Sequence, residues 1–98
     1  MTPLVTRRAR RHLEEIAEYI SERNPSAGRH VGARIREIID LLGTFPYMGR
    51  EGALTGTREM VVPGLPYIVV YRVSGPDPTV EIVGVYHGAQ RRPGQEPY

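Results

Sequence analysis

The hydrophobic period of this chain changes once, near the middle, and this change restricts the fold more than any other feature. Residues 7–22 and residues 26–42 each carry apolar side chains at helical spacing, with charged residues on the opposite face. Beyond Pro46 the apolar pattern becomes that of strands. The two helical segments are joined by a short link, so we predict an antiparallel helical hairpin followed by a sheet.

The ends of the helical segments carry recognisable signals. Thr6 is a candidate N-cap for the first helix. Asn24 and Pro25 break the first helix and start the second, since asparagine caps well and proline is accepted in a first helical turn. Gly43 is expected to close the second helix.

Three later segments are rich in β-branched and aromatic residues and are separated by proline–glycine turns: residues 57–62, 67–73 and 80–87. They should be antiparallel neighbours, and residues 3–5 could add a short strand at one edge. The glycines within residues 49–56 indicate a loop. The predicted fold class is α+β, in the order β-α-α-β-β-β, with the helical hairpin packed on one face of a small antiparallel sheet.

The composition of the chain excludes several kinds of chemistry. Its 98 residues give room for one domain, predicted over residues 1–92 with a loose tail at 93–98. With no cysteine, disulfides, thiolate metal sites and a cysteine nucleophile are excluded. All 13 basic residues are arginine, which excludes lysine chemistry. No secretory leader opens the chain and no apolar run would span a membrane, so we expect a cytoplasmic protein without a membrane partner.

The histidines give no sign of a metal site. His12 and His30 lie on the helical segments without other ligand types at metal-binding spacing, and both are expected at the surface. We therefore expect neither a metal nor a cofactor.

Strand alternation predicts a cationic surface on the sheet. If the helices cover one face, the other could present Arg58, Arg72 and His87, with Tyr71 nearby. Such a cationic surface suits binding to a phosphate backbone, and its histidine could move a proton near neutral pH. The alternative is structural: mid-strand arginines often pair with a neighbouring glutamate, and a histidine at a strand end is usually solvated.

The first helix opens with a run of basic residues, which the positive end of the helix dipole disfavours: Arg7, Arg8, Arg10 and Arg11. Pairing with Glu14 and Glu15, four residues after Arg10 and Arg11, would compensate two of the four. The functional alternative is an acidic partner segment or a nucleic acid.

An ordered set of short motifs closely resembles the ParE/RelE superfamily of toxins from type II toxin–antitoxin systems. It comprises Gly-Thr-Arg-Glu-Met-Val-Val at 56–62, Pro-Tyr-Ile-Val-Val-Tyr-Arg-Val at 66–73 and Val-Tyr-His-Gly-Ala-Gln at 85–90 with Pro93. Tyr-Ile at 19–20, Asn-Pro at 24–25 and Pro-x-x-Gly-Arg at 46–50 fit as well. The similarity covers nearly the whole chain.

The resemblance implies the same β-α-α-β-β-β fold and a cognate antitoxin whose acidic, amphipathic segment lies over the helical hairpin. Such a segment would supply the counter-charge for the four arginines. Members of the ParE branch bind DNA gyrase and stall it on cleaved DNA without a catalytic site, and the strand motifs favour this branch. Arg58, Arg72, Tyr71 and His87 would then contact the target.

Members of the RelE branch instead cleave mRNA on the ribosome, by attack of a ribose 2′-OH on the adjacent phosphate. Arg72 matches a catalytic arginine of that branch, and His87 lies near the place where some members have a histidine. Gly88 stands where a tyrosine usually follows. Glu51, Glu59 and His87 are all candidates for the base. A third interpretation is a non-toxic interaction module.

Overall fold

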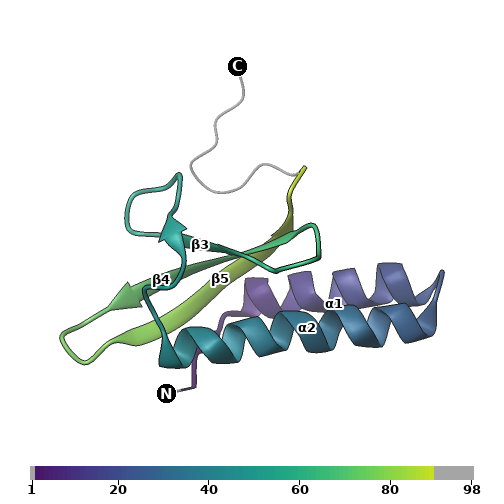
Figure 1. The fold of residues 1–98 in the computed structure, drawn as a ribbon, viewed down its shortest axis with the longest axis horizontal. Coiled ribbons are helices and arrows are strands. Elements are labelled where there is room, and N and C mark those ends of the chain that lie inside the picture. The colour runs from purple at the N-terminus through teal and green to yellow at the C-terminus, as the bar shows by residue number, and fades with distance from the viewer. Residues whose placement is uncertain (1, 90–98) are drawn as a thin grey trace.

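Two antiparallel helices cover one face of a five-stranded sheet in the computed structural model, which describes residues 2–89 (Figure 1). In chain order the elements are β1 (Leu4–Val5), α1 (Arg7–Ser21), α2 (Pro25–Thr44), β2 (Arg50–Glu51), β3 (Arg58–Val61), β4 (Tyr67–Ser74) and β5 (Thr79–His87). The predicted α+β fold is therefore confirmed. The tail predicted at 93–98 lies outside the described residues. No helix between residues 2 and 89 is both long enough and apolar enough to cross a bilayer.

Both helices begin with the predicted caps. The Thr6 hydroxyl accepts the Ala9 N–H at 3.1 Å, and the Asn24 side-chain oxygen accepts the Ala27 N–H at 3.1 Å. The predicted end of α2 needs a correction, because the helix continues through Gly43 to Thr44 and is capped by Phe45. Phe45 precedes a proline, whose ring disfavours helical backbone in the residue before it, so the helix stops there.

The sheet order is β1-β5-β4-β3-β2. All neighbouring strands are antiparallel except β1, which pairs with β5 in parallel, so the predicted antiparallel sheet is in fact mixed. The two-residue strand β2 was not predicted. It forms within the expected glycine loop, where Arg50 pairs with Glu59 and Glu51 with Arg58.

The hydrophobic core lies between the helices and one face of the sheet. Val69 and Tyr71 of β4 are fully buried there against Ile35 and Leu42 of α2. Residues paired directly across an antiparallel ladder share a face, so the register of β4 shows which side chains of the other strands face the helices.

A β-bulge interrupts β5. Val70 pairs with Gly84, but Tyr71 pairs with Ile82, which leaves Val83 as an extra residue. An extra residue reverses the alternation beyond it, so Ile82 and Val85 both face the helices although they are three residues apart. Strict alternation along residues 80–87 would place Glu81, Val83, Val85 and His87 on one face of the strand, and the bulge shows that this prediction is wrong.

Candidate functional site

The side chains predicted to form one cationic surface, Arg58, Arg72 and His87, do not lie together. Arg58 pairs with Tyr71, a core residue, and therefore lies on the helix-covered face. Arg72 follows Tyr71 on β4 and pairs with Glu81, so it lies on the opposite face, which the helices do not cover and which we call the open face. Its own side chain is exposed there. The two arginines cannot form one phosphate-binding surface.

His87 is also separated from Arg72. It pairs with Tyr67 at the other end of β4, and the two rings meet edge to face with centroids 5.7 Å apart. Tyr67 and Arg72 are five residues apart, which in a strand is about 17 Å. Arg72 and His87 thus lie on opposite faces and at opposite ends of the strand. A single phosphate could not contact both side chains in this arrangement.

The two candidate carboxylate bases have different environments. Glu59 is only 4% exposed, and its carboxylate accepts hydrogen bonds from the Arg50 guanidinium at 3.2 Å and the Ala53 N–H at 3.3 Å. These contacts fix the loop after β2, which indicates a structural role. Glu51 is exposed on β2, directly across from Arg58.

Tyr71 and Arg58 together hold the segment that leads into β2. The Tyr71 hydroxyl accepts the Gly49 N–H at 2.9 Å, and Arg58 donates to the Gly49 carbonyl at 2.7 Å. The Arg58 guanidinium also lies 5.1 Å from the centre of the Tyr47 ring. Burial raises the pKa of Tyr71, although its hydrogen bond with Gly49 and the charge of Arg58 oppose the change. Tyr71 is 0% exposed, so its predicted contact with a target requires correction.

The four arginines of α1 are all exposed, as expected of a docking surface. Arg11 lies 4.0 Å from Glu15, and both side chains remain more than 60% exposed, so this pair contributes little. The predicted pairing of Arg10 with Glu14 is not formed. Among residues 2–89, Arg7, Arg8 and Arg10 have no ion-pair partner, and the first turn of α1 holds no acidic residue.

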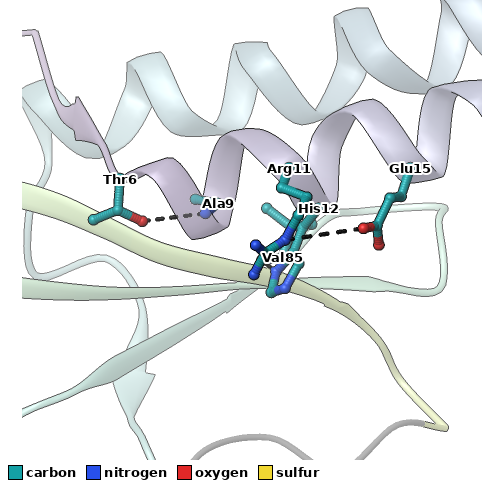
Figure 2. Close-up of polar contacts among 6 residues, drawn as sticks. All are labelled: Thr6, Ala9, Arg11, His12, Glu15 and Val85. Atoms are coloured by element: carbon teal, nitrogen blue, oxygen red, sulfur yellow. Dashed lines mark hydrogen bonds and ion pairs between the residues drawn. The ribbon is translucent and has the colours of Figure 1, made fainter.

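His12 is half-buried, so the surface position predicted from the sequence needs correction. Figure 2 shows its ring directed from α1 to β5, where Nδ1 accepts the Val85 N–H at 3.1 Å. Its ring also meets that of Tyr86 at a centroid distance of 4.9 Å. Burial lowers the pKa of His12 below 6.5, with help from Arg11 and Arg8 and against the charge of Glu15. His30, by contrast, is exposed as predicted.

A cleft of about 590 Å³ opens beside His12, between α1 and the paired ends of β4 and β5. We call it the α1–β5 cleft. Its walls include the rings of His12, Tyr19, Tyr67, Tyr86 and His87 and the aliphatic side chain of Ile16. Burial raises the pKa of Tyr67, and the nearby Tyr19 adds to the effect. Within the described part of the chain, no group of three or more metal-ligating side chains is placed to hold an ion.

Comparison with known proteins agrees with this architecture. Residues 4–92 match the model of the family described as ParE toxin of type II toxin-antitoxin system, parDE. A protein named "Putative toxin Y4kP" from Sinorhizobium fredii is 43% identical over 90% of this chain and 88% of its own length. Toxin RelE1 from Caulobacter vibrioides is 31% identical over 93% of this chain and 97% of its own.

A solved structure has the same fold. It is described as a chromosomal ParDE TA system from P. aeruginosa, and it superposes with a TM-score of 0.78 over 89% of this chain and 95% of the other, at 21% identity. The family match extends from β1 past the end of β5, and the relatives are similar over almost their whole length. The chain belongs to the ParE toxin family of type II toxin–antitoxin systems, within the ParE/RelE superfamily.

Proposed function

We propose that this toxin arrests bacterial growth by binding and poisoning DNA gyrase, as in the ParE branch, and that a cognate antitoxin neutralises it. The observation that carries the choice of target is the separation of Arg72 from His87 by about 17 Å and by the sheet itself. Ribonucleolytic cleavage needs a base, an acid and a charge stabiliser around one phosphate. Because the predicted catalytic pair cannot meet there, a toxin that acts by binding is favoured.

The surroundings of Glu59 support the same choice. A general base must reach the proton that it removes. The Glu59 carboxylate is buried and engaged by Arg50 and Ala53, so its contacts serve the loop rather than a substrate. Arg72 remains available on the open face as a contact for a target protein or for its bound DNA.

The arginines of α1 are the proposed contact for the antitoxin. Four guanidinium groups at the positive end of a helix dipole raise the electrostatic energy of the free toxin. An acidic segment laid along α1 would remove this cost on binding and would be attracted over a distance of about 10 Å at ordinary salt.

A ribosome-dependent mRNA endoribonuclease is the second candidate. Two observations favour it: the relatives named RelE1 and RelE2, at 31% and 34% identity, and the exposed Arg72 at the position of the catalytic arginine of that branch. In this case a rearrangement on the ribosome would have to bring a base to Arg72.

Expression of the chain without an antitoxin, with pulse labels for DNA and protein synthesis in the first minutes, separates these candidates. Gyrase poisoning predicts an early stop in DNA synthesis and accumulation of gyrase covalently attached to cleaved DNA, while translation continues. An early stop in translation with mRNA cut within codons would overturn the proposal in favour of the ribonuclease. Unimpaired growth would identify a non-toxic interaction module.

A further inference from the structure

The α1–β5 cleft is large enough to hold an aromatic side chain and has a lining that suits one. Its volume is about 590 Å³, and five of its lining residues are tyrosine or histidine. Aromatic walls attract another ring through edge-to-face and offset contacts, and one aromatic side chain buries about 150–250 Å². Tyr19, on the outer wall, is 59% exposed, so the cleft is accessible from solvent.

The backbone beside the cleft does not offer a strand edge. Thr6 donates to the Ile82 carbonyl from its N–H at 3.1 Å and from its hydroxyl at 2.8 Å. The His12 ring accepts a hydrogen bond from the Val85 N–H. Helix α1 and its N-cap therefore occupy the outer edge of β5 from Ile82 to Val85. A partner at this place must therefore dock through side chains rather than by adding a strand to β5.

The charges around the cleft select the chemistry of the partner. Arg8 and Arg11 act electrostatically on His12, and Arg23 stacks on Tyr19 with its guanidinium carbon 3.9 Å from the ring centre. Glu15 is the acidic residue of the lining, and it is paired with Arg11. Three arginines therefore lie beside the cleft, against one glutamate in its lining. Net positive surroundings of an aromatic pocket are complementary to an acidic segment that carries one bulky aromatic side chain.

We propose that the α1–β5 cleft is an anchor pocket that takes an aromatic side chain from an acidic partner segment. The proposal rests on the proposed function, in which that segment belongs to the antitoxin. The arginines of α1 attract the segment, whereas the cleft fixes its position along α1. Electrostatic steering by itself tolerates sliding, and a buried anchor removes that freedom.

The chain offers a matched pair of variants for the test. Tyr19 and Tyr47 are both 59% exposed, and each lies under an arginine, Arg23 or Arg58. Tyr19 lines the cleft, whereas Tyr47 lies beyond the end of α2, outside it. Tyr19→Ala and Tyr47→Ala therefore remove the same ring and the same kind of cation–π contact at two different places.

The probe is an acidic heptapeptide, Glu-Glu-Ala-Trp-Ala-Glu-Glu with blocked ends. Since the chain has no tryptophan, the fluorescence of the peptide reports binding without background. We expect Tyr19→Ala to weaken binding at least fivefold and Tyr47→Ala to change it less than twofold. Replacement of the peptide's tryptophan by alanine should weaken binding to the wild-type chain by a similar factor. Equal binding of the two peptides, or equal effects of the two variants, would overturn the proposal.

A second measurement separates this proposal from the proposed function. An antitoxin isolated by its ability to restore growth should bind Tyr19→Ala at least tenfold more weakly than the wild type and Tyr47→Ala normally. If it bound all three equally, the anchor pocket would be refuted while the toxin–antitoxin function stood. If the chain arrested no growth, the function would fail, and the peptide measurement would still decide whether the cleft binds an aromatic anchor.

Discussion

The Nδ1 atom of His12 on α1 accepts the backbone N–H of Val85 on β5 at 3.1 Å, a contact between residues 73 positions apart. Beyond the two-residue strand β1, Thr6 and His12 both bond to the backbone at the outer edge of β5. The contact requires an unprotonated Nδ1, since a protonated imidazole has no acceptor. This hydrogen bond therefore couples the packing of α1 against the sheet to pH.

The first prediction concerns the pH dependence of stability. The pKa of His12 is lowered in the folded chain, so the unfolded chain binds the proton first as the pH falls. The contribution of His12 should be fully present above about pH 7.5 and should decline as the pH drops through 6.5 toward its folded pKa. Urea unfolding of the wild type and of His12→Ala from pH 5 to 8 measures this contribution as the difference between their free energies of unfolding at each pH.

At pH 8, His12→Ala should lower the free energy of unfolding by about 1–3 kcal/mol, because the Val85 N–H loses its acceptor. This difference should shrink toward pH 5. His30→Ala removes an exposed histidine of α2 and is the control. It should have the same free energy of unfolding as the wild type at each pH. A difference between wild type and His12→Ala that is independent of pH would contradict the argument.

The second prediction contrasts two glycines. A Cβ at Gly49 would lie 2.6 Å from the Tyr71 hydroxyl and 2.7 Å from the Glu59 carbonyl oxygen, which are fixed by the core and by the sheet. Gly49→Ala should therefore destabilise the fold by about 2 kcal/mol. Gly32, in the interior of α2, has open space at the same position. Gly32→Ala should stabilise by about 0.5–1 kcal/mol, and thermal unfolding checks both signs.

The periodicity of the sequence predicted α1, α2 and the three longer strands because each is an amphipathic or β-rich segment bounded by local signals. The position of the side chains on the sheet was predicted less well. Strict alternation cannot reveal the extra residue Val83, and one bulge moved His87 to the face opposite that assumed. The face of Arg58 was misassigned for another reason: the register of β3 against β4 is set by the turn between them, not by either strand alone.

Two parts of the candidate site had no local signal at all. The acceptor role of His12 depends on a partner at the far end of the chain, and the α1–β5 cleft combines side chains from three elements. The arginines of α1 were found because their conflict with the helix dipole is visible in sequence.

The third prediction tests these arginines. The double variant Arg7→Glu, Arg10→Glu should weaken binding of the antitoxin at least tenfold and reduce the dependence of binding on salt, because counter-charge for the acidic segment is lost. Glutamate near the start of a helix is favourable to the dipole, so α1 itself should become slightly more stable. Weaker binding therefore could not be attributed to unfolding.

The control for this variant has the same net charge. Arg29→Glu, Arg34→Glu places the reversals on α2, where Arg34 pairs with Glu37 at the surface. It should retain antitoxin affinity within about twofold, apart from a general electrostatic effect that both variants share. Equal weakening in the two double variants, measured by calorimetry at two salt concentrations, would show that net charge rather than α1 is recognised.

The fourth prediction separates two arginines that the sequence places in one surface and the structure places on opposite faces. Arg58 holds the segment before β2 through the Gly49 carbonyl and lies near the Tyr47 ring, so Arg58→Ala should lower the free energy of unfolding by about 1–2 kcal/mol. Arg72 is exposed on the open face, and Arg72→Ala should change stability by less than about 0.5 kcal/mol.

The effects on toxicity should have the reverse order, with a larger effect for Arg72→Ala than for Arg58→Ala. For a toxin that binds gyrase, Arg72→Ala removes one contact among several, so growth arrest should need a higher expression level but should still occur. For a ribonuclease, loss of the charge stabiliser should reduce the rate of mRNA cleavage by a factor of about 100 or more, while ribosome binding persists. Titration of the inducer, with soluble protein quantified at each level, distinguishes a graded loss from an abrupt one. If Arg72→Ala were fully toxic at every level, the open face of the sheet would not be the surface that contacts the target.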